Sequence, residues 1–258
     1  MLSEENLATE VEKVIIWIRD YVKNASATGV VVGNSGGKDS ATVIALAVKA
    51  VGKENVLAVA MPCESELSDL VDAKLVCDTF LIPLEAIELS STYLNLEREM
   101  KQKLGVVGEK ISKEALANIK PRLRMTTLYA IAQSMGYLVI GTSNLSEIMV
   151  GYTTKWGDAA CDFNPIANFT VEEVKLIGKY LGVPDVIINK APNAGLDTGT
   201  DEQNLGVTYS QISEYINEGH TDEEAMKKIE KMNSASSHKR EKIPTYEFER
   251  KNYLKKLS

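Results

Sequence analysis

The sequence predicts an α/β fold, a doubly wound parallel sheet with helices on both faces, formed within one domain. Three observations support this prediction. Short apolar runs of β-branched residues recur along the chain, as expected for strands that are buried on both faces. Segments with helical periodicity alternate with these runs as far as about residue 190. With 258 residues, of which 44% are hydrophobic and 25% charged, the chain is long enough to form one large core.

The first sixty residues predict two helices that alternate with two strands. Apolar residues recur at helical spacing over 7–22, so a first helix is expected to end near 24–28. Gly29–Gly33 is a β-branched run bounded by glycines and is predicted to be a buried strand. A helix over 39–51 and a second strand over 56–60 then complete one βαβ unit.

The following segments continue the alternation. We expect a helix that opens at Ser68, a strand over Phe80–Leu84, helices over 89–103 and 113–133, and a strand over 137–141. Pro121 lies inside the last of these helices, where it is expected to produce a kink or a restart. Residues 28–190 are therefore assigned to an α/β nucleotide-binding core.

The last quarter of the chain predicts a functional loop and a helical extension. Residues 191–206 are polar and glycine-rich and form too long a segment for a simple connector, so a functional loop is expected. Thr221 has a glutamate three residues later, which is the spacing of a capping box and predicts a helix that runs to Met232. We assign residues 1–258 to a single domain in which 207–258 are a C-terminal helical extension.

Charge and hydropathy exclude several classes of partner. The 29 Lys and Arg residues against 36 Asp and Glu residues give a net charge of −7, which argues against long nucleic acid as a main partner. No apolar run approaches the roughly 18–20 residues that a membrane span requires. The N-terminus is acidic where a signal peptide would be basic. We therefore expect a cytoplasmic protein with neither a nucleic-acid nor a membrane partner.

The cysteines and histidines predict neither a disulfide framework nor a zinc site. Cys63, Cys77 and Cys161 lie too far apart for a C-x-x-C pair, and His220 and His238 are the two histidines of the chain. Free thiols in a reducing cytoplasm are the simplest interpretation.

The most informative segment is Gly33–Ser40, G-N-S-G-G-K-D-S, at the junction of a predicted strand and a predicted helix. Its small residues allow backbone N–H groups to approach a ligand, and the helix N-terminus adds a partial positive charge, so the segment suits a phosphate. Asp39 would repel a phosphate unless a cation lies between them. A Mg²⁺ ion that bridges Asp39 and phosphate oxygens resolves this conflict.

Two familiar phosphate motifs do not fit this loop. A Walker A loop requires a glycine and a hydroxyl residue at the positions of Val32 and Asp39. The dinucleotide pattern G-x-G-x-x-G fails because Gly33 is not followed by a glycine two residues later.

The hexapeptide S-G-G-x-D-S after a first strand resembles the pyrophosphate loop of the ATP pyrophosphatases, which split ATP between its α and β phosphates to adenylate a substrate. Further blocks are similar to those of one member family, NAD synthetase. They are N-I-x-x-R-x-R-M at 118–125, G-T-x-N-x-S-E at 141–147, G-Y-x-T-x-x-G-D at 151–158, D-x-x-P-I at 162–166 and H-K-R at 238–240. The resemblance covers most of the chain and implies an adenine nucleotide alpha hydrolase-like fold.

The resemblance also implies the reaction. It is the ATP-dependent amidation of deamido-NAD, the nicotinate dinucleotide, by ammonia, through an adenylated intermediate and with release of AMP and pyrophosphate, as the final step of NAD biosynthesis. ATP would be the co-substrate and Mg²⁺ the cofactor, and the family implies a homodimer. Glutamine-dependent members resemble this chain with an added nitrilase-like glutaminase domain, and no such segment precedes the first predicted helix, so free ammonia is the expected nitrogen source.

The matched blocks imply a role for individual residues. The residues implied to bind ATP are Gly33, Asn34, Ser35, Gly36, Gly37, Lys38, Asp39, Ser40 and Thr142. Those implied to bind deamido-NAD are Arg122, Lys155, Asp162, His238 and Lys239. Asp39 and Glu147 are implied Mg²⁺ ligands. Asp39 and Asp158 are the expected catalytic residues, and Asp158 is expected to position or deprotonate ammonium.

Two positions depart from the family pattern, and two other functions stay open. Val171 and Asn193 lie where the family commonly has a lysine and a hydroxyl residue that contact ATP, and Lys175, one helical turn from Val171, is an alternative source of the missing charge. Another ATP pyrophosphatase, such as a tRNA-modifying enzyme, would be expected to show a basic surface or a cysteine pair. A non-catalytic nucleotide sensor is the other alternative, although Asp39 and Glu147 argue against it.

Overall fold

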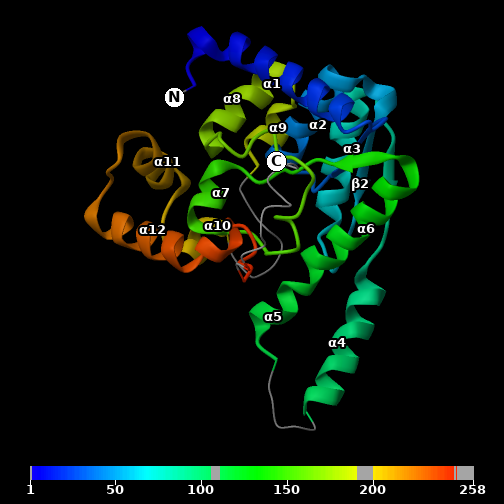
Figure 1. The fold of residues 1–258 in the computed structure, drawn as a ribbon, viewed down its shortest axis with the longest axis vertical. Coiled ribbons are helices and arrows are strands. Elements are labelled where there is room, and N and C mark those ends of the chain that lie inside the picture. Colours follow the sequence, from blue (N-terminus) through cyan, green and yellow to red (C-terminus); the bar gives the residue numbers. More distant parts are fainter. Residues whose placement is uncertain (1, 106–110, 191–199, 247, 249–258) are drawn as a thin grey trace.

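The structure is a computed structural model that describes residues 2–105, 111–190, 200–246 and 248. Its centre is a parallel sheet (Figure 1) made of β1 (Gly29–Gly33), β2 (Val56–Ala60), β3 (Leu84–Ala86) and β4 (Tyr137–Val139). The strand order is β3-β2-β1-β4, and each neighbouring pair is parallel. The predicted α/β class and parallel sheet are therefore confirmed.

The side chains of β1 alternate between two cores on opposite faces of the sheet. Val30 and Val32 belong to one hydrophobic cluster and Val31 to another, and all three are 0% exposed. The register of β1 pairs Val30 with Val56 on one side and with Leu138 on the other. Because neither face of the strand contacts solvent, a continuous apolar run is the pattern that this position requires.

Helices cover the first face of the sheet and bury Val30 and Val32. They are α1 (Glu4–Asn24), α2 (Lys38–Val51), α3 (Leu67–Phe80), α8 (Val171–Leu181) and α9 (Asp185–Ile188). A short 3₁₀ helix, η1 (Lys53–Asn55), leads into β2. In Figure 1, α1 lies along the outer side of this layer, where it packs against α2 and α8.

The second face is covered by helices from the middle of the chain. They are α4 (Ser90–Gly105), α5 (Lys113–Ala117) and α6 (Ile119–Met135). Helix α6 packs directly against β1 and β4, while α4 and α5 extend away from the body of the molecule (Figure 1). The two layers together confirm helices on both faces of the sheet.

The remaining elements pack at one side of the sheet. They are α7 (Leu145–Val150), α10 (Asp201–Leu205), α11 (Tyr209–Glu218), α12 (Glu223–Ala235) and the 3₁₀ helix η2 (Ser237–Lys239). A third hydrophobic cluster, which includes Val150, Val171, Tyr209, Ile212 and Ile229, joins α7 and the start of α8 to α11 and α12. Through this cluster, the C-terminal helices α11 and α12 pack against α7, which follows β4.

The predicted strand over Phe80–Leu84 is wrong. Phe80 is the last residue of α3, and Leu81 adopts a left-handed conformation with φ +56° that ends the helix. The N–H groups of Leu81 and Ile82 both donate to the carbonyl of Cys77, so the helix end is closed by backbone hydrogen bonds. The strand begins only after Pro83, at Leu84.

Two further boundary predictions are corrected. The segment predicted as helical over 113–133 restarts, as expected near Pro121, but the break lies at Asn118, between α5 and α6. Pro121 lies in the first turn of α6, where its missing N–H costs no helical hydrogen bond. The predicted capping box at Thr221 is also wrong. Asp222 caps α12 by accepting from the N–H of Ala225 at 2.9 Å, whereas the Thr221 hydroxyl donates to Glu214.

Part of the predicted functional loop is helical. Within 191–206, residues 201–205 form α10, capped by Thr200, and residues 191–199 lie outside the described part of the chain. Among the described residues, no helix is long and apolar enough to cross a bilayer. Cys63, Cys77 and Cys161 are free thiols.

Candidate active site

The predicted phosphate loop and the G-T-x-N-x-S-E block meet at the carboxyl ends of β1 and β4. The chain leaves β1 toward β2 and β3 on one side and returns later to β4 on the other side. The switch point of the sheet therefore lies between β1 and β4, and open α/β sheets bind ligands in the crevice at such a point. This geometry brings α2, which follows β1, close to α7, which follows β4.

The loop after β1 is held in shape by its own side chains. Gly36 has φ +73°, and its N–H donates to Oδ1 of Asn34 at 3.0 Å. The amide of Asn34 donates to the carbonyl of Ala73 at 2.9 Å, which ties the loop to α3. The hydroxyls of Ser35 and Ser40 lie 3.2 Å apart. Asn34 is 4% exposed, so in this structure its side chain shapes the loop and faces α3.

The N-terminus of α2 is open to an anion. Gly37 is the N-cap residue and offers no side chain to accept from the first N–H groups of the helix. A phosphate can accept from these N–H groups and gains from the helix dipole. The N-terminus of the 14-residue helix α2, which has no side-chain cap, lies where the loop sequence predicts a phosphate site, and the site itself stays a prediction.

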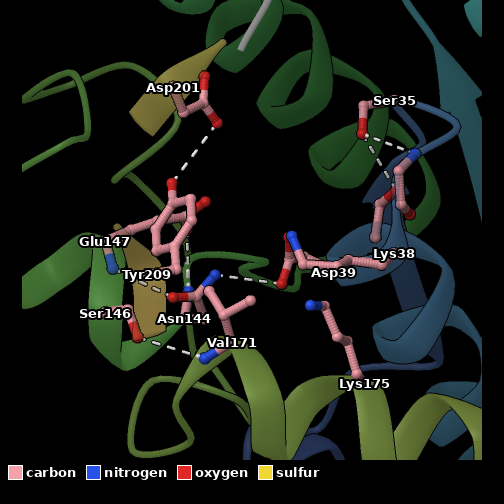
Figure 2. A network of polar contacts seen from close by, with 12 residues as sticks. Ser35, Lys38, Asp39, Asn144, Ser146, Glu147, Val171, Lys175, Asp201 and Tyr209 are labelled. Atoms are coloured by element: carbon pink, nitrogen blue, oxygen red, sulfur yellow. Dashed lines mark hydrogen bonds and ion pairs between the residues drawn. The ribbon is translucent and has the colours of Figure 1, made fainter. Parts of the chain in front are cut away.

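Asn144 joins the two implied metal ligands, Asp39 and Glu147 (Figure 2). Its side-chain amide donates to Oδ1 of Asp39 at 3.1 Å. Its Oδ1 accepts from the N–H of Glu147 at 3.0 Å, and Oε2 of Glu147 accepts from the N–H of Asn144 at 3.0 Å. This reciprocal pair is the capping box of α7. Glu147 therefore caps a helix and also faces the phosphate loop.

The electrostatics of Asp39 and Glu147 favour a bound cation. Burial, followed by the charge of Asp39, holds the pKa of Glu147 well above its ordinary value, and Lys38 lowers it again. The Lys38 ammonium donates to Oδ2 of Asp39 at 2.9 Å. Burial lowers the pKa of Lys38, but Asp39 and then Glu147 raise it by more, so this lysine stays charged. Two carboxylates facing one ammonium leave an excess of negative charge, and hard oxygen donors of this kind fit Mg²⁺.

Asn144 was not singled out from the sequence, and its role is testable with Asn144→Ser. Serine is also a good N-cap, so α7 should be retained and the melting temperature should change little. The amide that holds Asp39 is lost, and we expect kcat to fall about tenfold because the carboxylate is no longer fixed. Steady-state kinetics and thermal unfolding measure both effects. A kcat that stays at the wild-type value would show that the residue acts only as a cap.

The residues implied to bind the dinucleotide form a second group, linked by donations to backbone carbonyls. Arg122 donates from α6 to the carbonyl of Lys155 at 3.3 Å, and the Lys155 ammonium donates to the carbonyl of His238 at 2.6 Å. Lys239 donates to the carbonyls of Gly151 and Thr153, both at 2.7 Å. The structure thus brings Arg122, Lys155, His238 and Lys239 together from three distant segments.

Asp158 interacts electrostatically with one member of each group, Glu147 and Lys239. Its Oδ1 accepts from the N–H of Thr154 at 2.7 Å. Desolvation raises the pKa of the Asp158 carboxyl, and the hydrogen bonds from Thr154 and the charge of Lys239 oppose this rise. Asp158 also contributes to raising the pKa of Glu147, so its carboxylate is close enough to Glu147 to interact with it electrostatically.

Asp162 and Thr142 are the predicted residues that lie apart from these contacts. Both carboxylate oxygens of Asp162 have protein partners, because Oδ2 accepts from the N–H of Val139 at 2.7 Å and Oδ1 from the hydroxyl of Tyr129 at 3.4 Å. Burial and then Asp162 raise the pKa of Tyr129 to about 12. Thr142 lies in the segment between β4 and α7, beside the switch point.

A buried acid opposite the phosphate loop was missed by the sequence analysis. Asp201 is 5% exposed at the start of α10, and it accepts from the hydroxyls of Tyr152 at 3.2 Å and Tyr209 at 3.5 Å. Figure 2 shows Tyr209 and Asp201 across the site from Ser35. Burial and then Glu147 raise the pKa of Tyr209. The available signal was the position of Asp201 inside the predicted functional loop.

The position that lacks the family lysine is a packing position here. Val171 is 1% exposed within the third hydrophobic cluster, and its N–H donates to the hydroxyl of Ser146 at 3.2 Å. Lys175 forms an ion pair with Glu172 at 2.9 Å. Asn193, the second departure from the pattern, lies outside the described residues.

Comparison with known proteins gives concordant matches. The family model described as NAD synthase matches residues 10–244. A curated NH(3)-dependent NAD(+) synthetase from Carboxydothermus hydrogenoformans is 42% identical over 240 residues, which are 93% of this chain and 97% of that protein. One from Archaeoglobus fulgidus is 42% identical over 247 residues, which are 93% and 96% of the two chains.

Solved structures agree in fold. The NMN synthetase from Francisella tularensis superposes with a TM-score of 0.85 at 34% identity, covering 96% of this chain and 100% of that one. The NH3-dependent NAD synthetase from Campylobacter jejuni has a TM-score of 0.76 at 30% identity and covers 93% and 99% of the two chains.

Proposed function

This chain belongs to the NAD synthase family, and from that premise we infer that it is a ligase that uses ATP to join ammonia to deamido-NAD, forming NAD. The observation that carries this inference is the meeting of the phosphate loop with Asn144 and Glu147 at the switch point of the sheet. An open helix N-terminus and two acidic side chains meet there, which is what a metal-bound triphosphate requires.

The reaction needs activation because a carboxylate is a poor acyl donor. The nicotinate carboxylate attacks the α-phosphorus of ATP, and the bond to the bridging oxygen breaks, so that pyrophosphate leaves and an acyl adenylate forms. Ammonia then attacks the acyl carbon, AMP leaves and the amide remains. A site for this sequence has to bring two polyanions together and then admit ammonia.

The ATP end of the site lies at α2. We assign the phosphates to the N–H groups of the first turn of α2 and to the hydroxyls of Ser35 and Ser40, with Thr142 as a further ATP contact. Asp39 and Glu147 would hold Mg²⁺. When bound there, Mg²⁺ supplies positive charge that draws phosphate oxygens toward two carboxylates that would otherwise repel them.

We assign the dinucleotide to the second group of residues. Arg122, Lys155 and Lys239 carry the positive charge that its phosphates need, and His238 lies beside them. Asp162 is the assigned partner for a ribose hydroxyl or for the pyridinium ring, although accepting from a ligand requires it to share oxygens that already have protein donors.

Asp158 is assigned to ammonium. The carboxylate of Asp158, which acts on both Glu147 and Lys239, would attract the ammonium ion. The raised pKa of Asp158 brings its basicity closer to that needed to take a proton as the nitrogen attacks.

The defining experiment mixes the purified protein with ATP, Mg²⁺, deamido-NAD and ammonium and follows NAD and AMP. Equal amounts of NAD and AMP are expected. Glutamine replaces ammonium in a parallel reaction and should give no product. ATP consumption without NAD would contradict the assignment.

A mononucleotide substrate is the second candidate, because the Francisella tularensis structure with a TM-score of 0.85 is an NMN synthetase. The same assay with nicotinate mononucleotide in place of the dinucleotide separates the two substrates. The ratio of kcat/KM for the two decides between them, since both contain the carboxylate that reacts.

Replacement of Arg122 should act on the dinucleotide and leave ATP binding unchanged. For Arg122→Met we expect the KM for deamido-NAD to rise about tenfold, because one charge-assisted phosphate contact is lost. Arg19→Met is the control, since Arg19 of α1 likewise donates to a backbone carbonyl, that of Ala50 in α2, away from this group. Initial-rate kinetics with each substrate varied in turn measure the effect. An equal rise in the KM for ATP would place Arg122 elsewhere.

Assembly and location complete the proposal. We assign a homodimer, in which a second copy would cover the exposed apolar side chains of Leu94, Leu96 and Leu104 on α4. Sedimentation equilibrium tests this, and a monomer at micromolar concentration would contradict it. The free thiols agree with a cytoplasmic location.

A further inference from the structure

Lys38 is buried at the centre of the candidate site. Its side chain is 6% exposed, and its ammonium donates to Oδ2 of Asp39 at 2.9 Å. Glu147 and Asp201 also act on it electrostatically. The ammonium lies 6.0 Å from the centroid of the Tyr209 ring. The side chain of a lysine in a phosphate loop can point into solvent. Here the side chain of Lys38 instead faces the two acidic residues that are assigned to the metal.

We propose that Lys38 is a resident counter-ion of the metal site. Its ammonium offsets part of the negative charge of Asp39 and Glu147 while no metal is bound, and it would move to the phosphate oxygens of ATP when these two residues hold Mg²⁺. The proposal rests on the proposed function, in which these two acids hold Mg²⁺. The proposal adds a reason for the metal and the nucleotide to bind cooperatively.

The hydrogen bonds of Asp39 indicate which of its partners a metal would displace. Oδ1 accepts from the amide of Asn144 and Oδ2 from the ammonium of Lys38. The amide is fixed by the capping box of α7, whereas the ammonium is at the end of a flexible four-carbon chain. Mg²⁺ that binds Asp39 therefore competes with Lys38 for Oδ2.

The displaced ammonium has a nearby destination. Lys38 is the first residue of α2, directly after the N-cap Gly37, so its Cα lies at the open N-terminus where the phosphates are assigned. A rotation of the side chain would transfer the charge from the carboxylate toward the triphosphate. Metal bound at Asp39 and Glu147 would then free a cation for the nucleotide, and the two ligands would bind cooperatively.

Lys175 is the competing source of positive charge. Figure 2 shows it reaching toward Asp39 from α8, but it forms an ion pair with Glu172 and its side chain is 35% exposed. Lys175 therefore has an ion-pair partner other than Asp39 and Glu147. Lys38 has its ion pair with Asp39 itself, which is why the resident role is assigned to Lys38.

The test compares the metal-free full-length protein with Lys38→Met, which keeps an unbranched side chain about one atom shorter and removes the charge. Mn²⁺ binding without nucleotide, followed by electron paramagnetic resonance, should become at least about tenfold tighter in the variant, because the competing cation is gone. Binding of a non-hydrolysable ATP analogue with Mg²⁺, followed by calorimetry, should become about tenfold weaker. Structural damage would weaken both, so the opposite signs are diagnostic.

The controls separate the alternatives. Lys74→Met removes an exposed lysine paired with Asp78 on α3 and should leave both affinities unchanged. Lys175→Met should not tighten Mn²⁺ binding, and if it alone does so, the resident cation is Lys175. Lys38→Gln replaces the methionine variant if circular dichroism shows that the latter is unfolded.

Three results have different meanings. Unchanged or weaker Mn²⁺ binding in the Lys38 variant overturns the proposal. Mn²⁺ that binds neither protein, even with the nucleotide analogue present, while the wild type still forms NAD, removes the metal assignment of Asp39 and Glu147. Absence of NAD formation by the wild type refutes the proposed function instead.

Discussion

Asp39→Asn is expected to reduce kcat/KM for NAD formation about 1,000-fold while the fold is retained. The substitution keeps the shape of the side chain, and asparagine can still accept from the amide of Asn144 through its own oxygen. It removes one of the two charges that face the phosphate loop, so Mg²⁺ loses a ligand and the phosphates lose their bridge. The rate of NAD and AMP formation at substrate concentrations well below KM measures the loss.

The retained fold follows from two opposing changes. Asp39→Asn leaves the buried ammonium of Lys38 without its ion pair, which is destabilising, but it also removes the repulsion between Asp39 and Glu147. Asp78→Asn is a matched control, because Asp78 is a carboxylate on α3 with 62% side-chain exposure whose partner is Lys74. Activity of Asp39→Asn within tenfold of the wild type would rule out a metal bridge at this residue.

Gly36→Ala is expected to unfold the phosphate loop. Gly36 has φ +73°, a conformation that costs an alanine about 1–2 kcal/mol. An added Cβ would lie 2.6 Å from the backbone carbonyl oxygen of Asp69 and 2.8 Å from Cβ of Asp72, so the loop has to move away from α3. We expect the free energy of unfolding to fall by about 2 kcal/mol or more. Urea denaturation measures it.

ATP binding should fail together with the loop. The N–H of Gly36 donates to Asn34, and displacement of this turn would also move the residues that lead into α2. We therefore expect the affinity for a non-hydrolysable ATP analogue to fall at least about tenfold. Gly219→Ala is the control outside the site. Gly219 also has a left-handed conformation, with φ +78°, and an added Cβ would have no other described residue, apart from its chain neighbours, within 4 Å. If both variants weaken binding of the analogue equally, displacement of the loop at Gly36 is not the cause.

The elements predicted most accurately are those whose residues have a regular pattern of burial along their whole length. The strand Gly29–Gly33 and the strand at 56–60 were predicted with the bounds that the structure shows, because both are buried on two faces and a continuous apolar run reports that directly. The first helix was predicted from one apolar stripe, which is the face that packs against α2 and α8.

The errors lie where the chain ends an element. Phe80 is apolar whether it closes a helix or opens a strand, so composition did not distinguish the two, and the left-handed turn at Leu81 has no glycine to signal it. Thr221 and Asp222 are both good caps, and the choice between them depends on Glu214, which takes the threonine hydroxyl.

The sequence by itself determined the fold class, the phosphate loop and the family of this protein, because each depends on a local pattern of glycines, apolar runs and short motifs. The tertiary structure alone decided how the polar side chains are paired. Asn144 holds Asp39 across 105 residues of chain, and Lys38 turns inward to the same carboxylate. The partner of a charged group in a buried site is chosen by which atoms the packed helices bring within hydrogen-bond distance, and no local spacing encodes that choice.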